Sequence, residues 1–216
     1  DRIIPPPASD GIPFTDGGDD LARRLLAEFG HLHPYARVPS PLWCCYDLWG
    51  FENLMVMIAL NPGIVAHAAE RYLAHRLRDV RRAAALGARS IWIEECLTDM
   101  IAPEAFATAN LPSLRRLVDE IRACGMKSVY YYCGNPAGKW DLILSTGADA
   151  LSLEEGKKGF EIEIEDVASR VGGRMTVFGN LDAIGVLQDG TDGTLRAEIR
   201  RQIAAGRMNG SRFVMS

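Results

Sequence analysis

The stretch "KSVYYYCGN", Lys127 to Asn135, is a short apolar run that ends in a cysteine, a glycine and an asparagine. Valine and tyrosine favour strands, so this run predicts one. Directly before it, a helical pattern starts at Pro112, and Gly125 ends it; its apolar positions are Leu114, Leu117, Val118 and Ile121. A helix, a glycine stop and a buried strand in this order predict a β/α unit of a parallel sheet.

The same succession recurs along the chain. Further strands are expected at "LWCCYDL", "RSIWIEE", "ADALSL", "RMTVFG" and "RFVMS", that is Leu42–Leu48, Arg89–Glu95, Ala148–Leu153, Arg174–Gly179 and Arg212–Ser216. Helices are expected between them; in the clearest, Asn61 is the expected cap, Pro62 is the first helical residue and Gly87 ends the helix. Trp140–Ser145, Ile164–Val171 and Thr194–Ala205 complete the set.

The pattern predicts an irregular lead-in over residues 1–40, rich in proline and glycine, with one short helix at Leu21–Phe29. Residues 41–216 then form a single domain. Six strands with intervening helices suit either an open doubly wound sheet or most of a closed barrel. No glycine-rich phosphate fingerprint follows a strand, and polar groups recur at strand ends. We therefore predict an α/β fold of the (β/α)8 TIM-barrel type, incomplete, with about six units.

Composition limits the class of partner. The chain has 216 residues, 48% hydrophobic and 24% charged, with a formal net charge of -4, so it has no large basic field for nucleic acid or anionic lipid. No apolar run approaches the ~20 residues of a spanning helix. The five cysteines show no CxxC spacing, which favours a reducing cytoplasm. A small-molecule site is the expectation.

Polar residues follow nearly every predicted strand, and a barrel would bring them to one mouth. Strand alternation puts Tyr131 and Cys133 on one face, and it puts Glu94 and Glu95 on opposite faces, so that one of the two aims at the barrel axis. The strand-end groups are Asp47, Glu94, Glu95, Cys133, Asn135, Glu154, Glu155, Asn180 and Asp182.

Each of these groups also has a purely structural interpretation. Cysteine is among the most buried residue types, so Cys133 taken alone suits packing, as do the other four cysteines. The tyrosines are strand formers, and Glu154 with Glu155 suits a polar loop. The four histidines lie away from the strand ends and build neither a Ser-His-Asp set nor HExxH.

The motifs "YYYCGN", "GADALSLEE" and "FGNLDAIGVL", in this order, resemble the uroporphyrinogen decarboxylase superfamily. The likeness extends back through "GARSIWIEE" and weakly through "PLWCCYDLWGFENLM", so it covers roughly Pro41 to Ser216. The resemblance implies a (β/α)8 barrel, and the superfamily includes decarboxylases and cobalamin-dependent methyltransferases. Its thiol-alkylating methyltransferases carry His-x-Cys where this chain has Tyr131-Tyr132-Cys133, and then a glycine and often an asparagine, which Gly134 and Asn135 match.

In that branch the histidine, the cysteine and a second cysteine hold zinc, which lowers the pKa of a bound thiol. Here Tyr131 replaces the histidine, and a phenol with a pKa near 10 is a poor zinc ligand. The second cysteine would lie beyond Ser216. Glu94 or Glu95 could supply an oxygen ligand beside Cys133.

The resemblance therefore predicts a corrinoid-linked methyltransferase. Its partner would be a tetrapyrrole or corrinoid, delivered by a corrinoid protein, with zinc as the candidate cofactor. An unclosed barrel also predicts self-association. The alternatives are a uroporphyrinogen decarboxylase and a metal-free, non-catalytic barrel that binds a tetrapyrrole or a partner protein. The expected catalytic residues are Cys133, Glu94, Glu95 and Asp182, the substrate-binding residues Tyr131, Asn135, Glu154 and Asn180, and the metal ligands Cys133 with Glu94 or Glu95.

Overall fold

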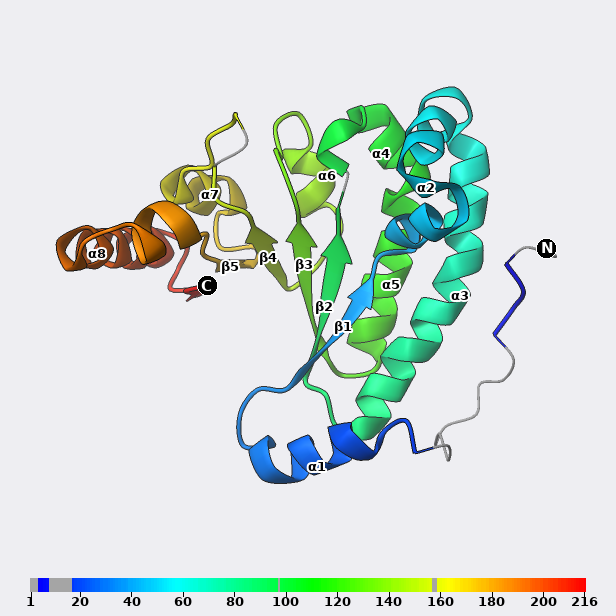
Figure 1. Ribbon diagram of the computed structural model, residues 1–216, viewed down its shortest axis with the longest axis horizontal. Coiled ribbons are helices and arrows are strands. Elements are labelled where there is room, and N and C mark those ends of the chain that lie inside the picture. Colours follow the sequence, from blue (N-terminus) through cyan, green and yellow to red (C-terminus); the bar gives the residue numbers. More distant parts are fainter. Residues whose placement is uncertain (1–3, 8–16, 97, 157–158) are drawn as a thin grey trace.

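The computed structural model describes residues 4–7, 17–96, 98–156 and 159–216. Parts of the predicted lead-in, residues 1–3 and 8–16, and part of the predicted loop after Glu155, residues 157–158, lie outside them. Within the described residues, six parallel strands form one sheet in the order β1-β2-β3-β4-β5-β6 (Figure 1). They are β1 (Tyr35–Pro39), β2 (Ser90–Glu95), β3 (Lys127–Tyr132), β4 (Ala150–Leu153), β5 (Thr176–Phe178) and β6 (Phe213–Val214).

Helices connect successive strands, and one further helix precedes β1. They are α1 (Asp20–Phe29), α2 (Pro41–Leu60), α3 (Pro62–Leu86), α4 (Pro103–Ala109), α5 (Leu111–Ala123), α6 (Trp140–Leu144), α7 (Ile164–Val171) and α8 (Asp192–Met208). A short 3-10 turn at Thr98–Met100 and a π-helix at Ala183–Gln188 lie in the loops after β2 and β5. No described helix is long and apolar enough to cross a membrane.

The strand order decides between the two sheet types that the pattern allows. Each strand pairs in parallel with the strand that follows it in sequence, so the order never reverses as it does in a doubly wound sheet. Within the described residues, β1 pairs only with β2 and β6 only with β5, so the sheet is open at both edges. The fold is therefore α/β, an incomplete barrel of the TIM type.

The strand predicted at Leu42–Leu48 is wrong, because this segment forms the first half of α2. Ser40 caps the helix, its Oγ accepting a hydrogen bond from the Trp43 backbone N–H at 2.9 Å, and Pro41 occupies the first helical position. The first strand is instead β1, inside the predicted irregular lead-in. Asp47 is an exposed residue of α2 and not a strand-end group.

The long helix predicted after Asn61 is confirmed as α3. It begins at Pro62, and Gly87 ends it in the left-handed region, with φ of 100°. The side chain of Asn61 makes no capping hydrogen bond, so that detail of the prediction is wrong. The remaining predicted strands are confirmed within about two residues of their ends.

The two faces of the sheet differ in what covers them. The outer face packs against helices; α3 and α5 lie side by side along it (Figure 1). Its side chains are fully or nearly fully buried: Ile91, Ile93, Tyr130, Tyr132, Leu151 and Leu153. The inner face carries the side chains of alternate positions and borders an open cleft of about 760 Å³. Trp92 lies central in it, with ring centroids 5.4 Å from Tyr131 and 6.0 Å from Phe178.

Candidate active site at the carboxyl ends of the strands

The register of the sheet builds one layer of side chains just beyond the strand ends. Tyr131 pairs with Ser152, and Ser152 pairs with Phe178. Side chains alternate between the two faces of the sheet, so the residues two positions later point to the same, inner face. These residues are Cys133, Glu154 and Asn180, and the register makes them neighbours. A strand pairing that is distant in sequence thus brings a thiol, a carboxylate and an amide together.

Glu154 is the centre of this layer. One of its carboxylate oxygens, Oε1, accepts hydrogen bonds from Cys133 Sγ at 3.0 Å and from the Tyr131 hydroxyl at 3.2 Å. The other, Oε2, accepts from the Gly134 backbone N–H at 3.1 Å. We call Tyr131, Cys133, Gly134 and Glu154 the carboxyl-end cluster.

Gly134 is the residue that lets the chain turn around this carboxylate. Its φ of 98° lies in the left-handed region, and a Cβ there would collide with the carboxyl group of Asp99. The glycine of "YYYCGN" therefore has a steric reason in this fold, and the turn directs its N–H to Glu154.

Both side-chain donors of the cluster, the Cys133 thiol and the Tyr131 hydroxyl, are held protonated. Burial raises the pKa of the Cys133 thiol, and its hydrogen bond to Glu154 raises that pKa further. Burial likewise raises the pKa of Tyr131, and the neighbouring Cys133 and Glu154 add to the effect. At neutral pH the cluster is therefore a thiol and a phenol that donate to one carboxylate.

Cys96 is a neighbour that the sequence pattern assigned to packing alone. Glu95 pairs with Tyr132, and the Cys133 N–H donates to the Glu95 carbonyl at 3.3 Å, so the extended register places Cys96 opposite Cys133. Burial raises the pKa of Cys96, and its thiol adds to the raised pKa of Cys133. The sequence alone does not place Cys96 beside Cys133, because their proximity depends on the pairing of β2 with β3.

The two glutamates at the end of β2 have separate surroundings, as alternation requires. Glu94 points to the inner face, where it forms an ion pair with Arg37 at 2.6 Å. Glu95 lies on the outer face with no exposed surface, and accepts hydrogen bonds from Ser40 Oγ and Asn110 Nδ2, both at 2.7 Å. Burial raises the pKa of Glu95 to about 8. Glu94 is therefore the member of the pair on the same face as Cys133.

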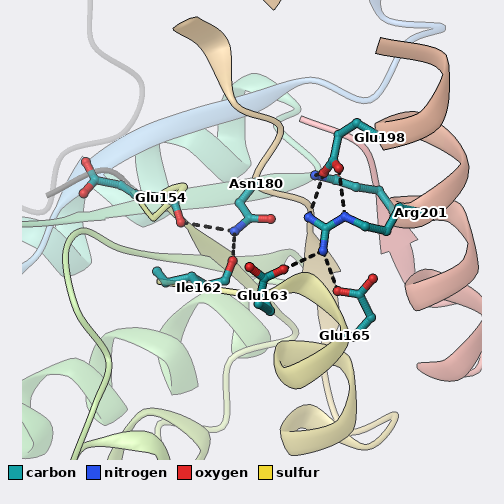
Figure 2. Close-up of polar contacts among 8 residues, drawn as sticks. Glu154, Ile162, Glu163, Glu165, Asn180, Glu198 and Arg201 are labelled. Atoms are coloured by element: carbon teal, nitrogen blue, oxygen red, sulfur yellow. Dashed lines mark hydrogen bonds and ion pairs between the residues drawn. The ribbon is translucent and has the colours of Figure 1, made fainter. Parts of the chain in front are cut away.

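The remaining expected site residues have local hydrogen bonds. Asn135 Oδ1 accepts from the Ala137 N–H at 2.9 Å and so shapes the turn after β3. Asp182 Oδ1 accepts from two backbone N–H groups and caps the π-helix. Asn180 is buried, and its Nδ2 donates to the carbonyls of Ile162 and Glu154 (Figure 2). Among these three, Asn180 adjoins the carboxyl-end cluster.

A zinc centre needs about four nitrogen, sulfur or carboxylate ligands in tetrahedral positions. Cys133 and Glu154 offer a soft and a hard ligand 3.0 Å apart, but Tyr131 occupies the third neighbouring position as a protonated phenol. Among the residues that the structure describes, no three or more His, Cys, Asp or Glu side chains form a group that could hold a metal ion. The described residues therefore do not fit a zinc centre.

Comparison with known proteins gives the family context. The model of the family described as uroporphyrinogen decarboxylase (URO-D) matches residues 23–216. The chain is 25% identical over 162 residues to the methylcobamide:CoM methyltransferase MtbA of Methanosarcina mazei, covering 74% of this chain and 44% of that protein. It is 30% identical over 207 residues to a uroporphyrinogen decarboxylase of Xanthomonas euvesicatoria, covering 94% and 50%. The chain thus spans about half the length of these curated relatives.

Proposed function

The chain belongs to the uroporphyrinogen decarboxylase family, and on that premise we propose that it takes part in methyl transfer from a corrinoid to a thiol at the carboxyl-end cluster. The family contains enzymes of two kinds among the relatives above, a methyltransferase and a decarboxylase. The methyltransferase is named for methylcobamide and CoM, which supports a corrinoid donor, brought by a corrinoid protein, and a thiol acceptor.

The observation that carries the proposal is the hydrogen bond from Cys133 Sγ to Glu154 Oε1. When a thiol takes a methyl group, its S–H bond breaks and an S–CH3 bond forms, while the electron pair of the broken carbon–cobalt bond stays with the corrinoid. The proton needs an acceptor. Glu154 is a carboxylate within 3.0 Å of a sulfur atom, which is the reach of a general base.

The other groups of the site take supporting roles in this proposal. The Cys133 thiol occupies the position from which Glu154 would take a proton. The Tyr131 hydroxyl and the Gly134 N–H hold the Glu154 carboxylate in its orientation toward that position. Glu94 places a second carboxylate on the inner face, balanced by Arg37. Asn180 and Asp182 line the mouth beyond β5.

The test is methyl transfer from methylcobalamin to coenzyme M or dithiothreitol, followed by corrinoid absorbance and by mass spectrometry of the S-methyl product. Glu154→Gln keeps the shape of the side chain and removes its basicity, so the rate should fall by about 100-fold or more. Glu155→Gln is the matched control, because alternation turns that side chain away from Cys133, and its rate should stay near wild type. A wild-type protein without transfer, or a Glu154→Gln variant as fast as wild type, contradicts the proposal.

The decarboxylase alternative rests on the relative that is matched over the larger share of this chain, 94%. It is tested by incubating the same protein with uroporphyrinogen and measuring carbon dioxide and the less carboxylated product. Release of carbon dioxide at a steady rate, with no methyl transfer, would replace the proposal by this alternative. Binding of a corrinoid or a porphyrin without either reaction would instead support a non-catalytic barrel.

A further inference from the structure

A second polar site lies at the carboxyl ends of β4 and β5, on the side of α7 and α8. It is a pocket of about 210 Å³. Its described lining carries five acidic side chains and one basic side chain, namely Glu155, Glu161, Glu163, Asp182 and Glu198 with Arg201. We call it the acidic pocket. It shares Asn180 and Asp182 with the mouth of the proposed methyl-transfer site, but Cys133 and Glu154 are not among its lining residues.

Arg201 is surrounded by more negative charge than it can balance (Figure 2). Its Nη1 contacts Glu163 at 2.7 Å and Glu165 at 2.6 Å, while Nε and Nη2 contact the two oxygens of Glu198 at 2.8 Å and 2.9 Å. The hydrogen bond from Arg201 lowers the pKa of Glu198, so this carboxylate stays ionised. One guanidinium thus faces three carboxylates, and an added cation would find a favourable potential beside them.

Asn180 provides an independent sign of a ligand. Its side chain is only 8% exposed, and Nδ2 donates to the carbonyl oxygens of Ile162 at 2.9 Å and Glu154 at 3.4 Å. These two acceptors fix the orientation of the amide, because a flipped amide would place oxygen against oxygen. Asn180 Oδ1 is therefore turned the other way, toward the side of Arg201 in Figure 2.

Within the described part of the chain, Asn180 Oδ1 has no hydrogen-bond partner. A buried acceptor without a donor costs roughly 1–3 kcal/mol, so it favours any ligand that brings a donor. The acidic pocket thus combines an excess of carboxylates with a buried oxygen that needs an N–H or O–H group.

We propose that the acidic pocket binds the ammonium group of a small organic amine, which donates a hydrogen bond to Asn180 Oδ1 and places its charge beside Glu163 and Glu198. An ammonium group supplies up to three donors with a positive charge, which matches both observations. A bare metal ion fits less well, because the described acidic residues do not converge on one point as metal ligands do.

The experiment follows amide chemical shifts of the isotope-labelled protein during titration with n-butylammonium chloride. Binding should be saturable, with shifts confined to residues around the pocket and a Kd on the order of 1 mM, as is usual for so small a ligand. Tetramethylammonium carries the same charge but no N–H donor, so it should bind at least several-fold more weakly. Magnesium and calcium chloride are titrated in parallel.

Two variants connect binding to the named residues. Glu163→Gln keeps the size of a half-exposed side chain and removes one charge, and should weaken butylammonium binding about threefold. Asn180→Ala removes the acceptor and should weaken it about tenfold, with thermal unfolding used to confirm that the variant folds. Asp192→Asn, at an exposed residue of α8 paired with Arg196, is the control and should bind like wild type.

Several results would overturn the inference. These are no saturable butylammonium binding, equal binding of tetramethylammonium, binding of the metal ions alone, or a Glu163→Gln variant that binds as tightly as wild type. Cys133→Ser should leave butylammonium binding unchanged. Failure here would therefore leave the methyl-transfer proposal standing, and failure of methyl transfer would leave this site standing.

Discussion

Cys133 Sγ lies 3.0 Å from Glu154 Oε1, across the extension of the β3–β4 pairing. The two residues are 21 positions apart in sequence, yet the parallel register makes them neighbours. The contact joins a donor whose pKa is raised by burial to a carboxylate that accepts two further hydrogen bonds. The contact directs the thiol proton of Cys133 toward the carboxylate of Glu154.

The first prediction concerns the reactivity of Cys133. Alkylation requires the thiolate, and burial together with Glu154 raises the pKa of this thiol, so iodoacetamide should label Cys133 far more slowly at pH ~8 than a free cysteine. Glu154→Gln removes the negative charge but not the burial, so labelling should accelerate several-fold and still stay below the free rate. Peptide mass spectrometry over a pH series measures the rate.

The control for this labelling is Glu155→Gln, whose side chain alternates away from the thiol. It should leave the pH profile of Cys133 labelling unchanged. Rapid labelling of the wild-type residue at neutral pH would show that the thiol is not held as the geometry indicates.

A second prediction separates collision from backbone strain at Gly134. Gly134→Ala must adopt a positive φ and also place a methyl group against Asp99. Gly138→Ala, in the same loop, has a φ of 74° and a nearest neighbour at 3.7 Å, so it carries the strain without the collision. Gly134→Ala should lower the free energy of unfolding by about 2 kcal/mol more than Gly138→Ala. Urea unfolding of both variants measures the difference, and equal losses would contradict it.

The third prediction is a pH dependence of stability that originates at Glu95. Burial raises its pKa from the ordinary 4.5 to about 8 in the folded protein, so the folded state binds a proton that the unfolded state releases. The stabilisation is complete below about pH 4.5 and is lost as pH rises toward about pH 8. Urea unfolding across this range should therefore show a falling free energy of unfolding.

Glu95→Gln should remove this slope, because an amide is neutral at every pH and can still bond Ser40 and Asn110. Glu94→Gln is the paired control on the other face of the same strand, and it should retain the slope. The assignment fails if Glu95→Gln and wild type lose stability in parallel as the pH rises.

Much of the fold could be read from the sequence because short apolar runs ending in glycine turns specify buried parallel strands. The error at Leu42–Leu48 has a local cause. Tryptophan, tyrosine and cysteine suggested a strand, while Ser40 and Pro41 are the cap and first residue of a helix, and that start signal decides the segment. For a short apolar segment, a helix cap at its start therefore predicts the secondary structure better than the residue composition does.

The site was predictable only in part. Alternation correctly grouped Tyr131 with Cys133, since both residues belong to one strand and its extension. The choice between Glu94 and Glu95 needed knowledge of which face the helices cover. Glu154 as the partner of Cys133, and Cys96 as its neighbour, depend on strand pairings that a single sequence does not reveal.

The last prediction is self-association through the open sheet. In the described chain, β1 and β6 each pair on one side only, which leaves rows of backbone N–H and C=O groups at both edges, beside an inner face rich in aromatic residues. Such edges pair readily with other chains, so light scattering should report a dimer or a larger species.

Val214→Lys places a charge on the edge strand β6, at a half-exposed residue of the inner face, and should shift the protein toward the monomer. Met208→Lys adds the same charge to an exposed apolar residue at the end of α8, outside the sheet, and should leave the assembly as it is. A strictly monomeric wild type, or an equal effect of the two substitutions, would show that the sheet edges do not drive association.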